Sequence, residues 1–126
     1  LIPISGFLPA RDPRVLATID AIQREICSGP FVWRYSTEEG VDGLAGDEGA
    51  FLICSFWLVS ALALAGRIEE AERNLDELRA LQNDVGLLSE EYDPVGRRLL
   101  GNFPQAFSHI GLLHSIFTLS EARTGR

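Results

Sequence analysis

The segment AFLICSFWLVSALALAG, residues 50–66, decides the fold of this chain. It is apolar on nearly every side of a helix, so it predicts a buried helix over residues 50–65 that ends at Gly66. Cysteine, serine and small residues interrupt the apolar run, and the run is short for a membrane span. We therefore expect a core helix of a globular protein and no membrane partner.

Helical patterns continue on both sides of this segment. Asp12 and Pro13 are typical of a helix start, and the sequence Ser-Gly-Pro at 28–30 is typical of its end. Residues 67–82 predict an amphipathic, half-exposed helix, and its short link to the buried helix indicates an antiparallel pair.

A last helix is predicted to begin at Pro104. Its apolar side is expected to consist of Ala106, Phe107, Ile110, Leu113, Phe117 and Leu119. Alternating buried and half-buried helices favour a layered helical barrel over a small free-standing bundle.

Two long connections lie between these helices. Residues 31–35 could be a short extended piece, whereas residues 37–49 hold four glycines and five acidic residues and predict a loop. Residues 83–103 predict a long irregular connection, and no strong strand pattern is present in the sequence. Connections this long inside compact domains are usually functional or disordered.

Charge and cysteine content limit the partners of the chain. The 126 residues carry a formal net charge of −7 with eleven scattered basic residues, which argues against nucleic acid. Cys27 and Cys54 could pair, but two cysteines do not make a disulfide scaffold, and we expect a reduced, cytoplasmic protein. The absence of methionine leads us to expect a segment of a longer protein.

The sequence LLSEEYDP, residues 87–94, places Glu90 and Glu91 before Tyr92 at the edge of an apolar run. A glycosidase needs two carboxylic groups across the scissile bond, one acting as an acid and the other as a base or nucleophile. A loop anchored by leucines could hold Glu90 still at the mouth of a pocket. The alternative is an exposed turn, because glutamate is almost never buried unpaired.

The sequence WRY, residues 33–35, offers a second set of binding groups. Arg34 can donate paired hydrogen bonds to hydroxyls or carboxylates, and Tyr35 offers an aromatic face to a sugar. Ion pairing and core packing would explain the same residues. Glu48, just before the buried helix, could lie at the rim of a barrel, although the helix dipole alone explains a carboxylate there.

The sequence FPQAFSH, residues 103–109, places Gln105, Ser108 and His109 near the start of the last helix. His109 and His114 are five residues apart, so they do not share a helix face as zinc ligands at i and i+4 do. We expect no metal site and no cofactor.

Taken together, three segments resemble the C-terminal catalytic region of glycoside hydrolase family 15, which includes glucoamylases, glucodextranases and bacterial trehalases. They are DGLAGDEGAFLICSFWLVSALALAGRIEEA, NDVGLLSEEYDP and LGNFPQAFSH, in this order and spacing. The resemblance runs from the first residues nearly to the end. It implies an all-α fold, with about four helices as a fragment of an (α/α)6 barrel, and inverting hydrolysis of α-glucosidic bonds.

The resemblance also implies roles for individual residues. Glu90, the first Glu of a segment similar to L-x-E-x-[YF]-D, is implied to be the general base. The residues implied to bind substrate are Arg34, Tyr35, Glu48, Glu91, Tyr92, Gln105, Ser108 and His109. The substrate is an α-glucosidic oligosaccharide or trehalose, and the sequence does not choose between them.

The general acid of the family lies before the start of this chain, and Glu38, Glu39 and Glu48 match other family positions. We therefore expect residues 1–126 to be a partial catalytic domain, inactive alone, with the rest of the domain as its partner. Exposed apolar helix faces could drive self-association. The alternatives are a helical interaction module and a non-catalytic carbohydrate-binding remnant.

Overall fold

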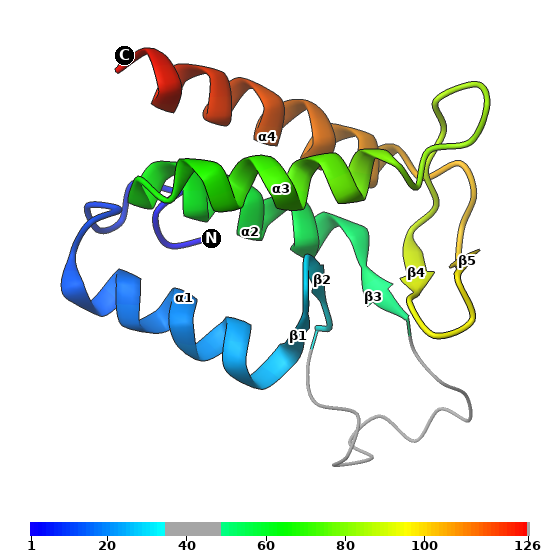
Figure 1. Cartoon of the computed structure of the whole chain (residues 1–126), viewed down its shortest axis with the longest axis horizontal. Coiled ribbons are helices and arrows are strands. Elements are labelled where there is room, and N and C mark those ends of the chain that lie inside the picture. The colour runs from blue at the N-terminus through cyan, green and yellow to red at the C-terminus, as the bar shows by residue number, and fades with distance from the viewer. Residues whose placement is uncertain (35–48, 126) are drawn as a thin grey trace.

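A computed structural model describes residues 1–34 and 49–125 of the chain. Tyr35, Glu38, Glu39, Glu48 and nearly all of the predicted loop at 37–49 lie outside the described residues. The described part contains the helices α1 (Pro13–Ile26), α2 (Leu52–Ala65), α3 (Ile68–Arg79) and α4 (Ala106–Thr124) (Figure 1). Its short strands are β1 (Cys27–Ser28), β2 (Phe31–Val32), β3 (Ala50–Phe51), β4 (Glu91–Asp93) and β5 (Arg98–Leu100).

Helix α2 is the centre of the core, as its sequence predicts. Most of its residues are buried, among them Phe56 and Leu62 with no exposed surface, and it packs against α1, α3 and α4. Gly66 ends it in the left-handed conformation, where its N–H and that of Arg67 bond to the last carbonyls of the helix. No helix in the described ranges is both long and apolar enough to cross a membrane.

Helix α1 begins where the sequence predicts. The Asp12 carboxylate accepts a hydrogen bond from the backbone N–H of Arg14, and Pro13 occupies the first helical position. The helix packs its buried residues Val15 and Ile19 into the core around α2. The start of α1 therefore follows from local capping chemistry.

Helix α4 differs from its prediction in its start and in its packed side. It begins at Ala106 rather than at Pro104, and the residues buried on it are mostly small. Gly111 allows the close approach to α2, because a Cβ at this position would lie 3.1 Å from the Phe56 Cβ. The residues of this buried side are Ser108, Gly111, Leu112, Ser115, Thr118 and Leu119.

Four residues of the predicted apolar side of α4 are exposed within the described structure. Phe107, Ile110, Leu113 and Phe117 expose between 49% and 67% of their surface. Side-chain size explains this exchange of faces, since small residues let two helix backbones come close whereas large ones keep them apart. Helix α4 therefore has a second apolar side that no described residue covers. Exposed apolar helix faces of this kind were expected for a part of a barrel.

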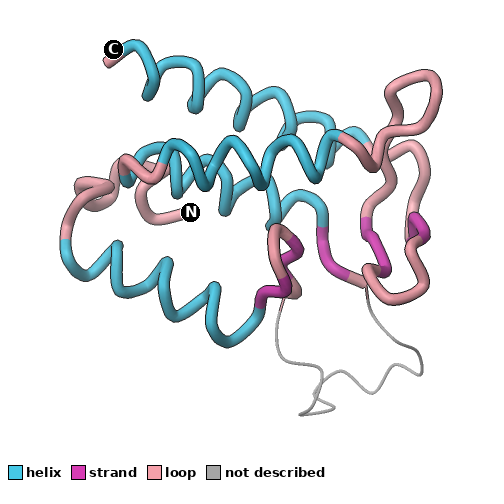
Figure 2. The backbone as a smooth tube through the Cα atoms, viewed as in Figure 1, coloured by secondary structure: helices cyan, strands magenta, loops and turns pink. Residues whose placement is uncertain are grey.

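The prediction of an irregular connection over residues 83–103 was wrong in one part, because this segment contains a hairpin. Strands β4 and β5 pair antiparallel, and β3 joins the other edge of β4, with Ala50 opposite Tyr92 and Glu91 opposite Leu100. Strands of two or three residues are too short to show an alternating pattern in the sequence. The strands lie together at one end of the helices (Figure 2).

The predicted extended piece at 31–35 corresponds in its first two residues to β2, which pairs with β1.

Candidate functional site

Glu90 lies at the end of the helices where the strands gather, immediately before β4 (Figure 1). Its backbone carbonyl accepts a hydrogen bond from the Leu52 N–H at 3.1 Å, at the start of α2. Its backbone N–H donates to the Asn102 carbonyl at 2.9 Å. The residue is thus fixed between the core helix and the segment after β5.

The carboxylate of Glu90 is held by Asn102. Its Oε2 accepts a hydrogen bond from the Asn102 Nδ2 at 2.9 Å and another from the Asn102 backbone N–H at 3.2 Å. Gly101 makes room for this contact, since a Cβ there would lie 3.0 Å from both Cβ and Oε2 of Glu90. Its φ of +72° is also a conformation that favours glycine.

Sequence reasoning did not identify Asn102 as the hydrogen-bond partner of Glu90. The signal was present, because Asn102 stands in the LGNFPQAFSH segment that carries the family resemblance. Its pairing with Glu90 depends on the hairpin between them.

A cavity of about 250 Å³ lies beside Glu90. Four of the predicted site residues line it together, namely Arg34, Glu90, Gln105 and Ser108. The Arg34 guanidinium carbon lies 4.2 Å from the centre of the Phe51 ring, within cation–π distance. In the described part of the chain, the Gln105 side chain has no hydrogen-bond partner. The remaining lining residues are Phe51, Ile53, Cys54, Trp57 and Phe107.

Ser108 and His109 contact the loop that carries Glu90. The buried Ser108 hydroxyl donates to the Ser89 carbonyl at 2.7 Å. The Leu88 N–H donates to Nε2 of His109 at 3.2 Å, so Nε2 is unprotonated and the proton is on Nδ1, which donates to the Gln105 carbonyl at 2.7 Å. The start of α4 therefore fixes the backbone at residues 88–89.

The Ser108 hydrogen bond gives a testable difference between two buried serines of α4. Ser115 also has a buried hydroxyl, but it donates to Leu112 of its own helix at 2.8 Å. In the full-length protein we expect Ser108→Ala to reduce the free energy of unfolding by about 1–3 kcal/mol, because the Ser89 carbonyl loses its side-chain donor. Ser115→Ala should cost less, because the Leu112 carbonyl lies within helix α4. Urea unfolding of both variants measures the difference, and equal losses would contradict it.

Glu91 and Tyr92 lie on β4, and the described residues that line the cavity do not include them. The Glu91 Oε2 accepts a hydrogen bond from the Gly49 N–H at 2.9 Å. The Tyr92 ring packs against Phe31 with 5.0 Å between ring centres. Hydrogen bonds from the Gly96 backbone, with further donors in Val95 and Arg98, lower the pKa of Asp93 at the end of β4.

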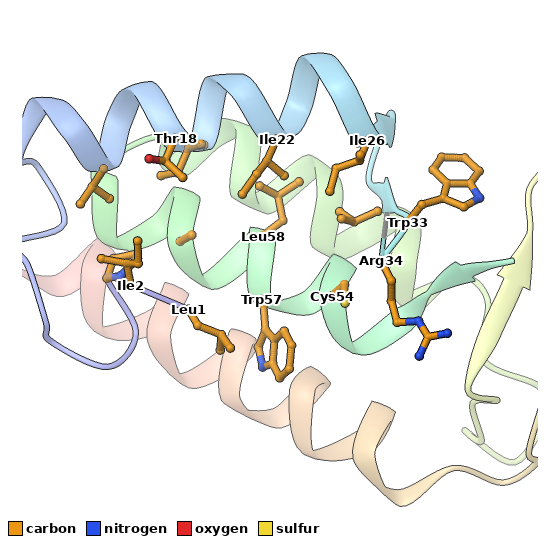
Figure 3. Close-up of a pocket in the computed structure, with 15 residues that line it drawn as sticks. Leu1, Ile2, Thr18, Ile22, Ile26, Trp33, Arg34, Cys54, Trp57 and Leu58 are labelled. Carbon is orange, nitrogen blue, oxygen red and sulfur yellow. The ribbon is translucent and has the colours of Figure 1, made fainter. Parts of the chain in front are cut away.

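A larger apolar cavity of about 750 Å³ adjoins the first one (Figure 3). Residues of the N-terminal segment, α1 and α2 line it, and Arg34, Cys54 and Trp57 border both cavities. In Figure 3, Trp57 and Leu58 extend from α2 between the surrounding elements. The apolar lining extends from the neighbourhood of Glu90 into the space between α1 and α2.

The two cysteines offer no reactive group to this region. Both are free, and burial raises the pKa of Cys27 to about 11 and raises that of Cys54. A protonated thiol is a poor nucleophile and a poor metal ligand. Among residues 1–34 and 49–125, no group of three His, Cys, Asp or Glu side chains could hold a metal ion.

Known proteins resemble this chain in sequence and in fold. The family model described as "Glycosyl hydrolases family 15" matches residues 1–117. A trehalase of Mycolicibacterium smegmatis is 48% identical over 90% of this chain and 17% of its own length. A trehalase of Mycobacterium tuberculosis is 45% identical over 92% of this chain and 17% of its own length.

A solved structure described as a wild-type glycosidase superposes with a TM-score of 0.70 at 23% identity, over 91% of this chain and 33% of that chain. This likeness confirms the predicted fold, a helical fragment of an (α/α)6 barrel. The chain spans less than a fifth of the length of the two trehalases.

Proposed function

Because this chain belongs to glycosyl hydrolase family 15, we propose that the full-length protein containing it hydrolyses trehalose with inversion, and that Glu90 is its general base. The observation that carries the proposal is the Glu90 carboxylate, held by Asn102 through Oε2 beside a cavity. Relatives named trehalase, 40–48% identical to this chain, support trehalose over other α-glucosides.

The proposed reaction follows from how the two oxygens of Glu90 are used. Oε2 accepts the Asn102 hydrogen bonds, and within the described residues Oε1 has no hydrogen-bond partner. Oε1 is therefore available to remove a proton from a water molecule as the water oxygen bonds to the anomeric carbon. The bond from that carbon to the bridging oxygen breaks, and a second carboxylic acid protonates the leaving oxygen.

Other residues of the chain have supporting roles in the proposal. Arg34 and Gln105, which line the cavity with Glu90, are proposed to bind hydroxyls of the sugar. Tyr35 and Glu48 are assigned to substrate binding by family resemblance. Glu91, Tyr92, Ser108 and His109 are also proposed to bind substrate, as the family resemblance implies. Their hydrogen bonds and ring contacts help to keep the Glu90 loop and the neighbouring strand in place.

We further propose that residues 1–126 are a C-terminal part of the catalytic domain and that the rest of the domain supplies the acid. The isolated chain is then inactive. The two free cysteines support the cytoplasmic placement predicted from the sequence.

Proton NMR of the full-length protein with trehalose tests the proposal. Both anomeric carbons of trehalose are α, so inversion at one of them releases one β-glucose for each α-glucose before mutarotation. We expect equal early signals of the two anomers. Early α-glucose alone would indicate retention and would overturn the mechanism. No glucose from trehalose, maltose or isomaltose would instead favour a binding or structural role.

A further inference from the structure

We propose that Asn102 is the positioning residue of Glu90, and that its side-chain N–H donor directs the carboxylate so that Oε1 faces the attacking water. The inference rests on the proposed function, because it assigns a partner to the proposed base. It assigns a role to a residue for which neither the glutamate pair nor the family resemblance had supplied one.

The pair is joined by three hydrogen bonds between the same two residues. The Glu90 N–H donates to the Asn102 carbonyl, and the Asn102 N–H and Nδ2 both donate to Oε2 of Glu90. The backbone bond sets the distance between the residues, and the side-chain bond sets the rotation of the carboxylate. Hydrogen bonds to an ionised acceptor are about twice as strong as bonds between neutral groups.

The direction of these bonds identifies which atom of Asn102 matters. An ionised carboxylate only accepts hydrogen bonds, so the amide nitrogen of Asn102 must face Glu90 and its oxygen must point elsewhere. An aspartate at position 102 would keep the shape of the side chain but replace the donor by an acceptor. The positioning role therefore requires an amide, whereas a role in packing requires only the shape.

The loop supplies an asparagine with the opposite chemistry as a matched control. Asn83, at the other end of the same loop, uses its Oδ1 to accept hydrogen bonds from the N–H groups of Val85 and Leu87 at 3.1 and 2.8 Å. An aspartate at position 83 retains that acceptor. Asn102→Asp and Asn83→Asp thus make the same chemical change, but only the first removes a donor that the loop uses.

Steady-state kinetics of the full-length protein with trehalose test the inference. We expect Asn102→Asp to lower kcat by about 100-fold with KM within about twofold, because a misdirected base loses turnover more than binding. Asn102→Ala, which leaves the backbone donor in place, should lower kcat about tenfold. Asn83→Asp should keep kcat within about twofold of the wild type.

The outcomes separate this inference from the proposed function. Wild-type kcat in Asn102→Ala or Asn102→Asp would overturn the inference, as would equal losses of kcat in the two aspartate variants. If Asn102→Asp does not fold, Asn102→Ala decides alone, with circular dichroism as the check on its fold. If Glu90→Gln keeps its turnover, the proposed function fails first. If Glu90→Gln is inactive and both Asn102 variants are fully active, only the role of Asn102 fails.

Discussion

Glu90→Gln in the full-length protein is expected to lower kcat for trehalose by about 10²–10⁴-fold, the usual contribution of one acid–base group. The glutamine side chain has nearly the same shape, and its oxygen can still accept the hydrogen bonds of Asn102. It cannot take a proton from water at neutral pH. KM should stay within about twofold, because the variant leaves Arg34 and Gln105, the proposed substrate-binding residues, unchanged.

The matched control for this variant is Glu70→Gln. Glu70 lies on α3, where its carboxylate accepts hydrogen bonds from Gln23 and Arg67 at 2.7 Å each. The change removes the same charge from a hydrogen-bonded glutamate that belongs to neither cavity. We expect Glu70→Gln to keep the wild-type kcat. A Glu90→Gln variant with more than half of that turnover would show that another group is the base.

The isolated chain, residues 1–126, is expected to release no glucose from trehalose, a loss of at least about 100-fold against the full-length protein. Inverting hydrolysis needs an acid and a base about 6.5–9.5 Å apart, and we assign only the base to this chain. The uncovered side of α4, with Phe117 at 67% exposure, should also make the chain self-associate. Proton NMR measures the turnover and light scattering measures the association.

A two-polypeptide experiment distinguishes an incomplete site from a misfolded one. Co-expression of the chain with the remainder of its protein should restore glucose release, because the second polypeptide brings the acid and covers the apolar faces. The same experiment with Glu90→Gln in the chain should not restore it. Release of glucose by the purified chain alone would contradict the division of the catalytic groups between the two parts.

The helices could be predicted from the sequence to the extent that their signals are local. The cap at Asp12 and Pro13 fixed the start of α1, and the apolar run at 50–65 identified the core helix. For α4 the same reasoning chose the wrong side as packed. Helix α4 has apolar residues on more than one side. The side that packs against α2 is decided by the close fit of Gly111 against Phe56. A fit of this kind depends on the sequences of both helices, so it cannot be predicted from the sequence of α4 alone.

The candidate site shows the same limit. Glu90, Arg34 and Gln105 were predicted from motifs, and the structure places all three around one cavity. The proposed roles of Ser108, His109 and Asn102 rest on hydrogen bonds to residues 12 to 21 positions away. These bonds depend on the strand register of a hairpin too short to leave a pattern in the sequence. The residue types can thus indicate the chemistry of the site, whereas the hydrogen-bond partners of each residue follow from the strand register.

In the hairpin formed by β4 and β5, the two strands cannot change in length, whereas the turn between them can. Glu90 is bonded before β4 and Asn102 after β5, so a shift of one residue in either strand would turn alternate side chains to the opposite face. The turn between the strands has no such strand register, although Asp93 accepts hydrogen bonds from the Val95 and Gly96 N–H groups, and Val95 at its tip is 94% exposed. Natural insertions, or a reporter peptide added by design, are therefore best accommodated at Val95, only a few residues from the proposed base.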